Sequence, residues 1–159
     1  MTLQNLPIGI QNFEKIRNDG YLYVDKTEIV YRLATSGSYY FLSRPRRFGK
    51  SLLLSTLQAY FEGKRELFDG LAISRLETKW ERYPILHLDL NTRNYKDAEA
   101  LTGILNEYLE KWEVIYGDAK KDRVLEERFT YVIEQAYAKT GHRVVILVDE
   151  YDKPMLQAI

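Results

Sequence analysis

Three consecutive residues, Gly49, Lys50 and Ser51, carry groups suited to binding phosphate. They match the last three positions of the phosphate-loop pattern G-x-x-x-x-G-K-[ST], although Arg44 stands where the pattern has its first glycine. A glycine lets the backbone approach a phosphate, a lysine ammonium reaches the β- and γ-phosphates, and a serine hydroxyl is a ligand for Mg²⁺. The incomplete pattern therefore predicts a phosphate-binding turn.

The chain around this turn is strongly basic. Four cations lie close together without an acid among them: Arg44, Arg46, Arg47 and Lys50. Such a cluster binds an anion or is solvated at the surface, and by itself it also resembles a nucleic-acid-binding or targeting patch. The cluster follows an apolar run and precedes an apolar helical pattern, and this position favours the phosphate-loop interpretation.

Two acids, Asp149 and Glu150, directly follow the apolar run at residues 144–148. In nucleotide-hydrolysing proteins an aspartate at the end of such a strand holds Mg²⁺. A glutamate after it can polarise the attacking water. The alternative is that both acids only cap the next helix and complement its dipole. We favour the Mg²⁺ interpretation, because the turn at residues 49–51 is expected at the same edge of the same sheet.

Asp89 ends a second apolar run and has two interpretations. Its carboxylate could contact Mg²⁺ or water, or it could form a local turn with Asn91, and we favour the turn because both residue types form such bonds readily. His87, inside the same run, is interpreted as a core histidine rather than a catalyst.

The elements that must position these residues follow from the apolar spacing. We expect buried strands at residues 39–42, 85–90 and 144–148. We expect helices at residues 25–33, 50–61, 101–112 and 125–136. Asp25 and Glu28 have the spacing of a capping box for the first helix, and Gly37 is placed to end it. Strands separated by helices predict an α/β fold in three layers, with a parallel sheet covered on both faces. Ligands of such sheets bind beyond the carboxyl ends of the strands.

Composition narrows the classes of function. The chain has 159 residues, the length of about one domain, with 23 basic and 23 acidic residues. A net charge of zero gives no general attraction to nucleic acid or to anionic lipid. Disulfides, thiolate metal sites and thiol catalysis are excluded because there is no cysteine. The longest apolar run is far shorter than the ~20 residues that span a bilayer, and no signal peptide is visible, so we expect a cytoplasmic protein without a membrane partner.

Four segments together are similar to a known family. They are Leu6-Pro7-Ile8-Gly9, Tyr23-Val24-Asp25-Lys26-Thr27, the segment from Arg44 to Leu52, and Val148-Asp149-Glu150-Tyr151-Asp152. They resemble the AAA-ATPase-like family of bacteria and archaea, whose members carry an N-terminal P-loop ATPase domain, often followed by a restriction-type nuclease-fold domain. The resemblance covers nearly the whole chain. That family also replaces the first glycine of the loop, as this chain does.

The resemblance implies a P-loop NTPase-type sheet, ATP and Mg²⁺ as cofactors, and a set of site residues. The implied ATP-binding residues are Arg44, Pro45, Arg46, Arg47, Phe48, Gly49, Lys50, Ser51 and Leu52. Mg²⁺ is expected at Ser51 and Asp149, and hydrolysis is expected to depend on Lys50 and Glu150. By the same resemblance, residues 1–159 form a single domain, with residues 1–38 as an N-terminal extension and helix and 39–159 as the P-loop core.

One departure from the family pattern concerns the sheet. Domains of this kind have more core strands than the three identified here, and one missing strand is expected between the first and the third. We therefore expect a truncated chain that pairs with a second copy, pairs with a missing C-terminal part, or leaves a gap in its sheet. Besides an ATPase, three functions stay open: a nucleotide-dependent switch or binding module without turnover, a nucleic-acid-binding module that uses the basic loop, and a phosphotransferase that passes phosphate to a small acceptor.

Overall fold

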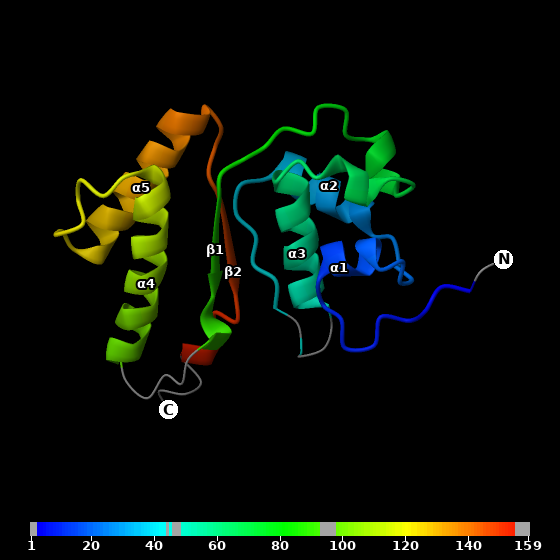
Figure 1. The fold of residues 1–159 in the computed structure, drawn as a ribbon, viewed down its shortest axis with the longest axis horizontal. Coiled ribbons are helices and arrows are strands. Elements are labelled where there is room, and N and C mark those ends of the chain that lie inside the picture. Colours follow the sequence, from blue (N-terminus) through cyan, green and yellow to red (C-terminus); the bar gives the residue numbers. More distant parts are fainter. Residues whose placement is uncertain (1–2, 44, 46–48, 93–97, 155–159) are drawn as a thin grey trace. The chain divides into compact units, whose positions relative to one another are not determined.

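The computed structural model describes residues 3–43, 45, 49–92 and 98–154. The chain divides into two compact units, residues 1–82 and residues 83–159, called here the first and the second unit. Within the described residues, the first unit is helical and the second combines two parallel strands with helices (Figure 1). Each unit has hydrophobic clusters of its own and is described by itself.

The first unit is built around buried aromatic rings. Its helices are α1 (Phe13–Asn18), α2 (Thr27–Ser36), α3 (Lys50–Phe61) and the 3₁₀ helices η1 (Arg65–Phe68) and η2 (Ala72–Arg75). Phe13 and Phe68 are fully buried, with ring centroids 4.7 Å apart, and Trp80 lies 5.1 Å from Phe68. Large rings bury much apolar area each, so these short helices can share one core. α3 contributes Ala59 and Tyr60 to it.

The start of α2 differs from the predicted capping box. Its N-cap is Lys26, and the Asp25 carboxylate instead accepts hydrogen bonds from the Thr27 N–H and hydroxyl, at 2.9 and 2.6 Å. The other Asp25 oxygen accepts the Ala72 N–H at 2.7 Å, while Glu28 pairs with Arg32 along the helix. Asp25 lies one residue too early to cap the helix, so it joins the start of α2 to η2. The predicted helix end at Gly37 is confirmed.

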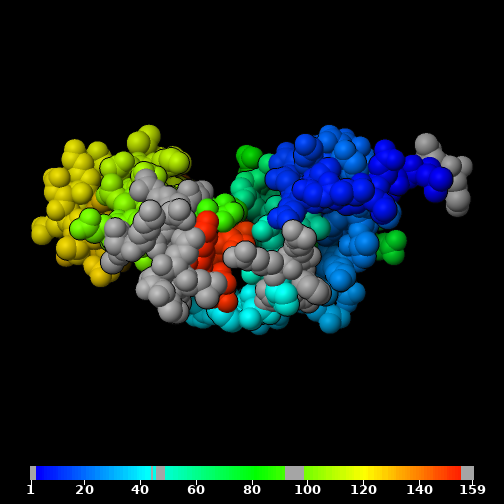
Figure 2. Space-filling view, turned by 90° about the horizontal axis from the view of Figure 1, so that it is seen from below, coloured from blue at the N-terminus to red at the C-terminus, as the bar shows by residue number. Residues whose placement is uncertain are grey.

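The predicted strand at residues 39–42 is wrong. The structure assigns no strand there, and Tyr39 and Phe41 have exposed fractions of 97% and 72%. Figure 2 shows this cyan segment at the surface. An extended segment becomes a strand only when a neighbour supplies its ladder of hydrogen bonds, and the two strands among the described residues pair with each other in the second unit. Four apolar residues in a row do not reveal whether such a neighbour exists.

The second unit holds the parallel strand pair. Its elements are β1 (Ile85–Asp89), η3 (Leu90–Thr92), α4 (Ala98–Tyr116), α5 (Leu125–Thr140) and β2 (Val145–Asp149). β1 and β2 are adjacent and in parallel register from Ile85 opposite Val145 to Asp89 opposite Asp149. α4 and α5 pack against one face of this pair, where Leu86 meets apolar side chains of both helices (Figure 1).

Most predicted elements are confirmed. The strands expected at residues 85–90 and 144–148 are β1 and β2, and the helices expected at 50–61, 101–112 and 125–136 are α3, α4 and α5. Parallel strands connected through helices agree with the α/β class in its coarse form. The complete three-layer P-loop sheet stays a prediction. Among the helices that the structure describes, none is long and apolar enough to cross a membrane.

Candidate functional site

The predicted phosphate-binding turn opens a helix. Gly49 is the N-cap of α3 and has a left-handed backbone, with φ 78°, and Lys50 and Ser51 are the first two residues of the helix. The first N–H groups of a helix have no partner within it, and the helix dipole favours an anion there. This arrangement agrees with the helix side of the sequence pattern, whereas the strand expected before the turn, at residues 39–42, is not present.

The remaining predicted loop residues are divided between described and undescribed parts. Pro45 is exposed, and Leu52 packs against the core of the first unit. The predictions for Arg44, Arg46, Arg47 and Phe48 lie outside the described residues. α3 itself is held in place by Ser55, whose hydroxyl accepts the Phe13 N–H at 3.0 Å. The start of α3 is therefore fixed relative to α1.

The predicted metal-binding acid lies at the end of β2, beside a second acid. Asp149 is the last residue of β2 and lies opposite Asp89, the last residue of β1. Paired positions of neighbouring strands are about 5 Å apart, with side chains on the same face. Each carboxylate accepts a local backbone N–H: Asp89 from Asn91 at 2.8 Å, and Asp149 from Glu150 at 2.9 Å. The predicted turn between Asp89 and Asn91 is confirmed.

Glu150 has an unusual backbone conformation. Its φ is 55°, in the left-handed region that residues with a side chain rarely adopt. The chain turns sharply here, and the Lys153 N–H donates to the Glu150 carbonyl at 3.1 Å to close the turn. Strained residues of this kind persist only where neighbouring contacts hold them, and they concentrate at functional sites.

Two further residues anchor the strand ends, and sequence reasoning did not identify either. The Lys153 ammonium donates to the Asn91 carbonyl at 2.6 Å and to its side-chain oxygen at 2.9 Å. The Tyr108 hydroxyl, from α4, accepts the Asp89 N–H at 3.1 Å and donates to the Asp89 carbonyl at 3.3 Å. Tyr108 occupies an apolar position in the helical pattern, so the sequence indicated packing rather than a hydrogen bond from its hydroxyl. The sequence around Lys153 contains no pattern that indicates its contact with Asn91.

The side chains present have the chemistry that Mg²⁺ requires. Ser51 offers a hydroxyl, and Asp89 and Asp149 offer carboxylates, all hard oxygen donors. Among the residues that the structure describes, no group of three or more His, Cys, Asp or Glu could hold a metal by itself. Mg²⁺ is commonly held by one or two carboxylates together with substrate phosphates, so these donors fit a metal that binds with a nucleotide. Ser51 belongs to the first unit and both carboxylates to the second.

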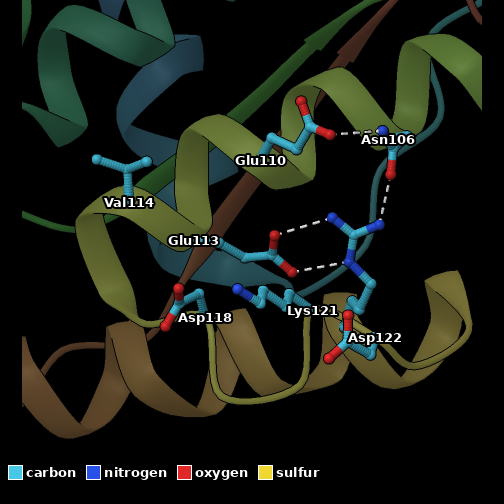
Figure 3. Close-up of a pocket in the computed structure, with 8 residues that line it drawn as sticks. Asn106, Glu110, Glu113, Val114, Asp118, Lys121 and Asp122 are labelled. Carbon is cyan, nitrogen blue, oxygen red and sulfur yellow. Dashed lines mark hydrogen bonds and ion pairs between the residues drawn. The ribbon is translucent and has the colours of Figure 1, made fainter.

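A separate polar cluster in the second unit surrounds a cavity of about 360 Å³ (Figure 3). Arg128 of α5 forms a two-point ion pair with Glu113 of α4, with both N···O distances 2.8 Å. The two side chains are only 7% and 6% exposed, and the hydrogen bonds that Arg128 donates to the Glu113 carboxylate raise the pKa of Arg128. Arg128 also donates to Asn106, which in turn donates to Glu110. This network joins α4 to α5.

We did not predict this ion pair from the sequence. Arg128 lies three residues after Leu125 and four before Val132, which places a cation on the apolar face of its helix. That position was the available signal, because a charge there is buried only if a partner neutralises it.

Comparison with known proteins identifies the family. A family model described as predicted AAA-ATPase matches residues 7–159. An uncharacterized protein in the vnfD 5' region of Azotobacter chroococcum mcd 1 is 47% identical over 160 residues, which cover 98% of this chain and 30% of that protein. No solved structure matches the chain. Because the family match extends over almost the entire sequence, the chain belongs to the AAA-ATPase-like family of predicted AAA-ATPases.

Proposed function

We propose that this chain is a P-loop domain that binds ATP and hydrolyses it with Mg²⁺. The observation that carries the proposal is the start of α3, where a left-handed glycine is followed at once by Lys50 and Ser51. In a member of a predicted ATPase family, this turn supplies the groups that a nucleotide phosphate requires.

Each proposed role follows from the chemistry of the side chain. Lys50 neutralises the β- and γ-phosphate oxygens, and the loop from Arg44 to Leu52 surrounds the phosphates. Ser51 and Asp149 hold Mg²⁺, which supplies charge neutralisation at the phosphates when it is bound. Glu150 orients or deprotonates the attacking water. Catalysis then rests on positioning and electrostatics rather than on a covalent intermediate.

The proposal brings together residues of both units. Lys50 and Ser51 belong to the first unit, and Asp149 and Glu150 to the second. Because Ser51 and Asp149 are both proposed to hold Mg²⁺, metal-dependent affinity is the most direct test.

The test is calorimetric titration of ATP with and without Mg²⁺. We expect affinity that depends on Mg²⁺ in the parent chain, loss of binding in Lys50→Ala, and loss of the metal dependence in Asp149→Ala. Lys139→Met is the matched control, because Lys139 is an exposed lysine whose ammonium contacts the Ile115 carbonyl in α4. Equal, metal-independent affinity in all four proteins would show that the site is assigned wrongly.

Turnover is tested separately with Glu150→Gln. We expect this variant to bind MgATP like the parent and to hydrolyse it at least about a hundredfold more slowly, as for loss of a positioned general base. If the parent binds MgATP but has no turnover, the domain is a nucleotide-dependent switch, and the hydrolytic part of the proposal is wrong.

A further inference from the structure

We propose that Lys153 is a positioning residue for Glu150. Its ammonium connects the turn after β2 to Asn91, which follows β1, and so holds Glu150 in the conformation in which it acts on water. The inference rests on the proposed function, because it assigns Lys153 a role through the glutamate that is proposed to act on water. All contacts that carry it lie within the second unit.

The backbone at Glu150 is strained. A left-handed φ of 55° is unfavourable for a residue with a side chain, because Cβ comes too close to the following carbonyl oxygen. A turn free of restraint would relax to negative φ, and the carboxylate would then leave its present position. The conformation therefore needs contacts on both sides of Glu150 to maintain it.

Hydrogen bonds restrain the backbone on both sides of Glu150. On its N-terminal side, Glu150 donates its own N–H to the Asp149 carboxylate, and β2 is paired with β1 up to Asp149. On its C-terminal side, the Lys153 N–H donates to the Glu150 carbonyl. The Lys153 ammonium then makes its two contacts with Asn91, at 2.6 and 2.9 Å.

Asn91, which Lys153 contacts, is itself held in place by hydrogen bonds. The Asn91 N–H donates to the Asp89 carboxylate, and the backbone of Asp89 is held on both sides by the Tyr108 hydroxyl. The Asn91 carbonyl is therefore part of a fixed strand end rather than of a free loop. Through its two contacts with Asn91, Lys153 holds in place the turn that contains Glu150.

The experiment compares Lys153→Met with Lys153→Arg and with Lys139→Met. Methionine keeps the length and apolar stem of the side chain and removes the ammonium, so we expect kcat to fall by about ten- to a hundredfold while affinity for MgATP is unchanged. Arginine retains a donor cation and is expected to restore most of the rate. Lys139→Met removes a lysine–carbonyl contact elsewhere in the same unit and is expected to keep the parent rate.

A second variant tests the contact itself. Asn91→Ala removes only the side-chain acceptor and leaves the backbone carbonyl and the N–H to Asp89, so its loss of kcat is expected to be smaller. The double variant with Lys153→Met is expected to be no slower than Lys153→Met alone, because both changes act on one contact. Additive losses would mean that the two residues act separately, which would overturn the inference.

Amide hydrogen exchange gives a readout that needs no turnover. We expect faster exchange at residues 149–152 in Lys153→Met than in the parent or in Lys139→Met, with an unchanged midpoint of unfolding. If the parent chain hydrolyses ATP and Lys153→Met does so equally fast, Lys153 is not a positioning residue, and the proposed function stands. If the parent has no turnover, the proposal of ATP hydrolysis is wrong. Equal amide exchange in the parent, Lys153→Met and Lys139→Met would show, independently of turnover, that Lys153 does not hold the turn.

Discussion

Two polar regions of the second unit differ in how their charged side chains are arranged. Around Arg128, opposite charges are buried and paired at two points, and the surrounding side chains add further hydrogen bonds. At the ends of β1 and β2, two like charges, Asp89 and Asp149, lie at paired positions beside a strained glutamate. The first arrangement neutralises its charges within the fold. The second places two like charges at paired positions, where a bound cation would stabilise both.

In this unit, the residues that line the cavity are not the residues proposed for the functional site. The cavity of about 360 Å³ is lined by the network around Arg128, in which Arg128 and Glu113 neutralise each other. At the ends of the strands, two carboxylates lie at paired positions beside a strained backbone, and such backbone strain concentrates at functional sites. Four predictions test this contrast.

The largest effect is expected from breaking the buried ion pair. Glu113→Ala leaves Arg128 charged and buried without its main partner, so the free energy of unfolding is expected to fall by about 3–5 kcal/mol. Urea denaturation of the chain measures this free energy of unfolding. Glu127→Ala is the control, because its pair with Arg123 is exposed and 3.8 Å long, and a change within about 0.5 kcal/mol is expected. A loss below about 1 kcal/mol in Glu113→Ala would contradict the structural role of the pair.

A smaller effect is expected from the strain at Glu150. Glycine adopts the left-handed conformation without a steric cost, whereas alanine keeps that cost, so Glu150→Gly is expected to be more stable than Glu150→Ala by about 1–2 kcal/mol. Greater flexibility of glycine in the unfolded chain reduces the difference by part of that amount. Midpoints of urea unfolding for the two variants decide it, and equal midpoints would show that the turn carries no strain.

A third effect, smaller again, is expected from removing one of the like charges. Asp149→Asn keeps an oxygen that can accept the Glu150 N–H and relieves repulsion by Asp89. We expect the free energy of unfolding to stay equal or to rise by about 0.2–1 kcal/mol, while metal-dependent ATP affinity is lost. A marked loss of stability would place Asp149 with the structural charges instead.

The smallest effect concerns Asp25, a carboxylate of the first unit whose charge is stabilised by hydrogen bonds. Partial burial acts to raise its pKa, but hydrogen bonds from Thr27 and Ala72 outweigh burial and lower the pKa below its usual value. The native state therefore gains stability above the unfolded pKa of about 3.9, and it loses this gain as the pH falls through the lowered pKa. Asp25→Asn is expected to be less stable at neutral pH, and its urea midpoint should approach that of the parent in acid. A constant difference at all pH values would contradict this assignment.

Regular elements were predictable where apolar spacing was long or was bounded by polar residues. α4 and α5 have many apolar positions at helical intervals, and β2 is a run of β-branched and aliphatic residues that ends at Asp149. The segment at residues 39–42 has the same local composition as a strand, but its state depends on a neighbour that spacing cannot reveal. Local pattern sets propensity, and tertiary pairing decides the outcome.

The candidate site was predictable to the same extent. Gly49 and Asp149 were located from motifs, because each motif includes the element that follows or precedes it. Contacts between distant segments were not predictable: Lys153 reaches a residue 62 positions earlier, and Tyr108 reaches a strand end 19 positions earlier. Such contacts depend on the register of the strands and on the packing of α4, which no spacing rule states.

The backbone at Gly49 has a consequence for which residues the loop can accept. A methyl group built on Gly49 meets no atom of the described residues within 4 Å. The requirement is one of handedness, since φ is 78°. Asparagine and aspartate enter the left-handed region more readily than other residues with side chains. Asparagine is therefore the mildest replacement for the backbone, and a β-branched residue such as valine the most damaging.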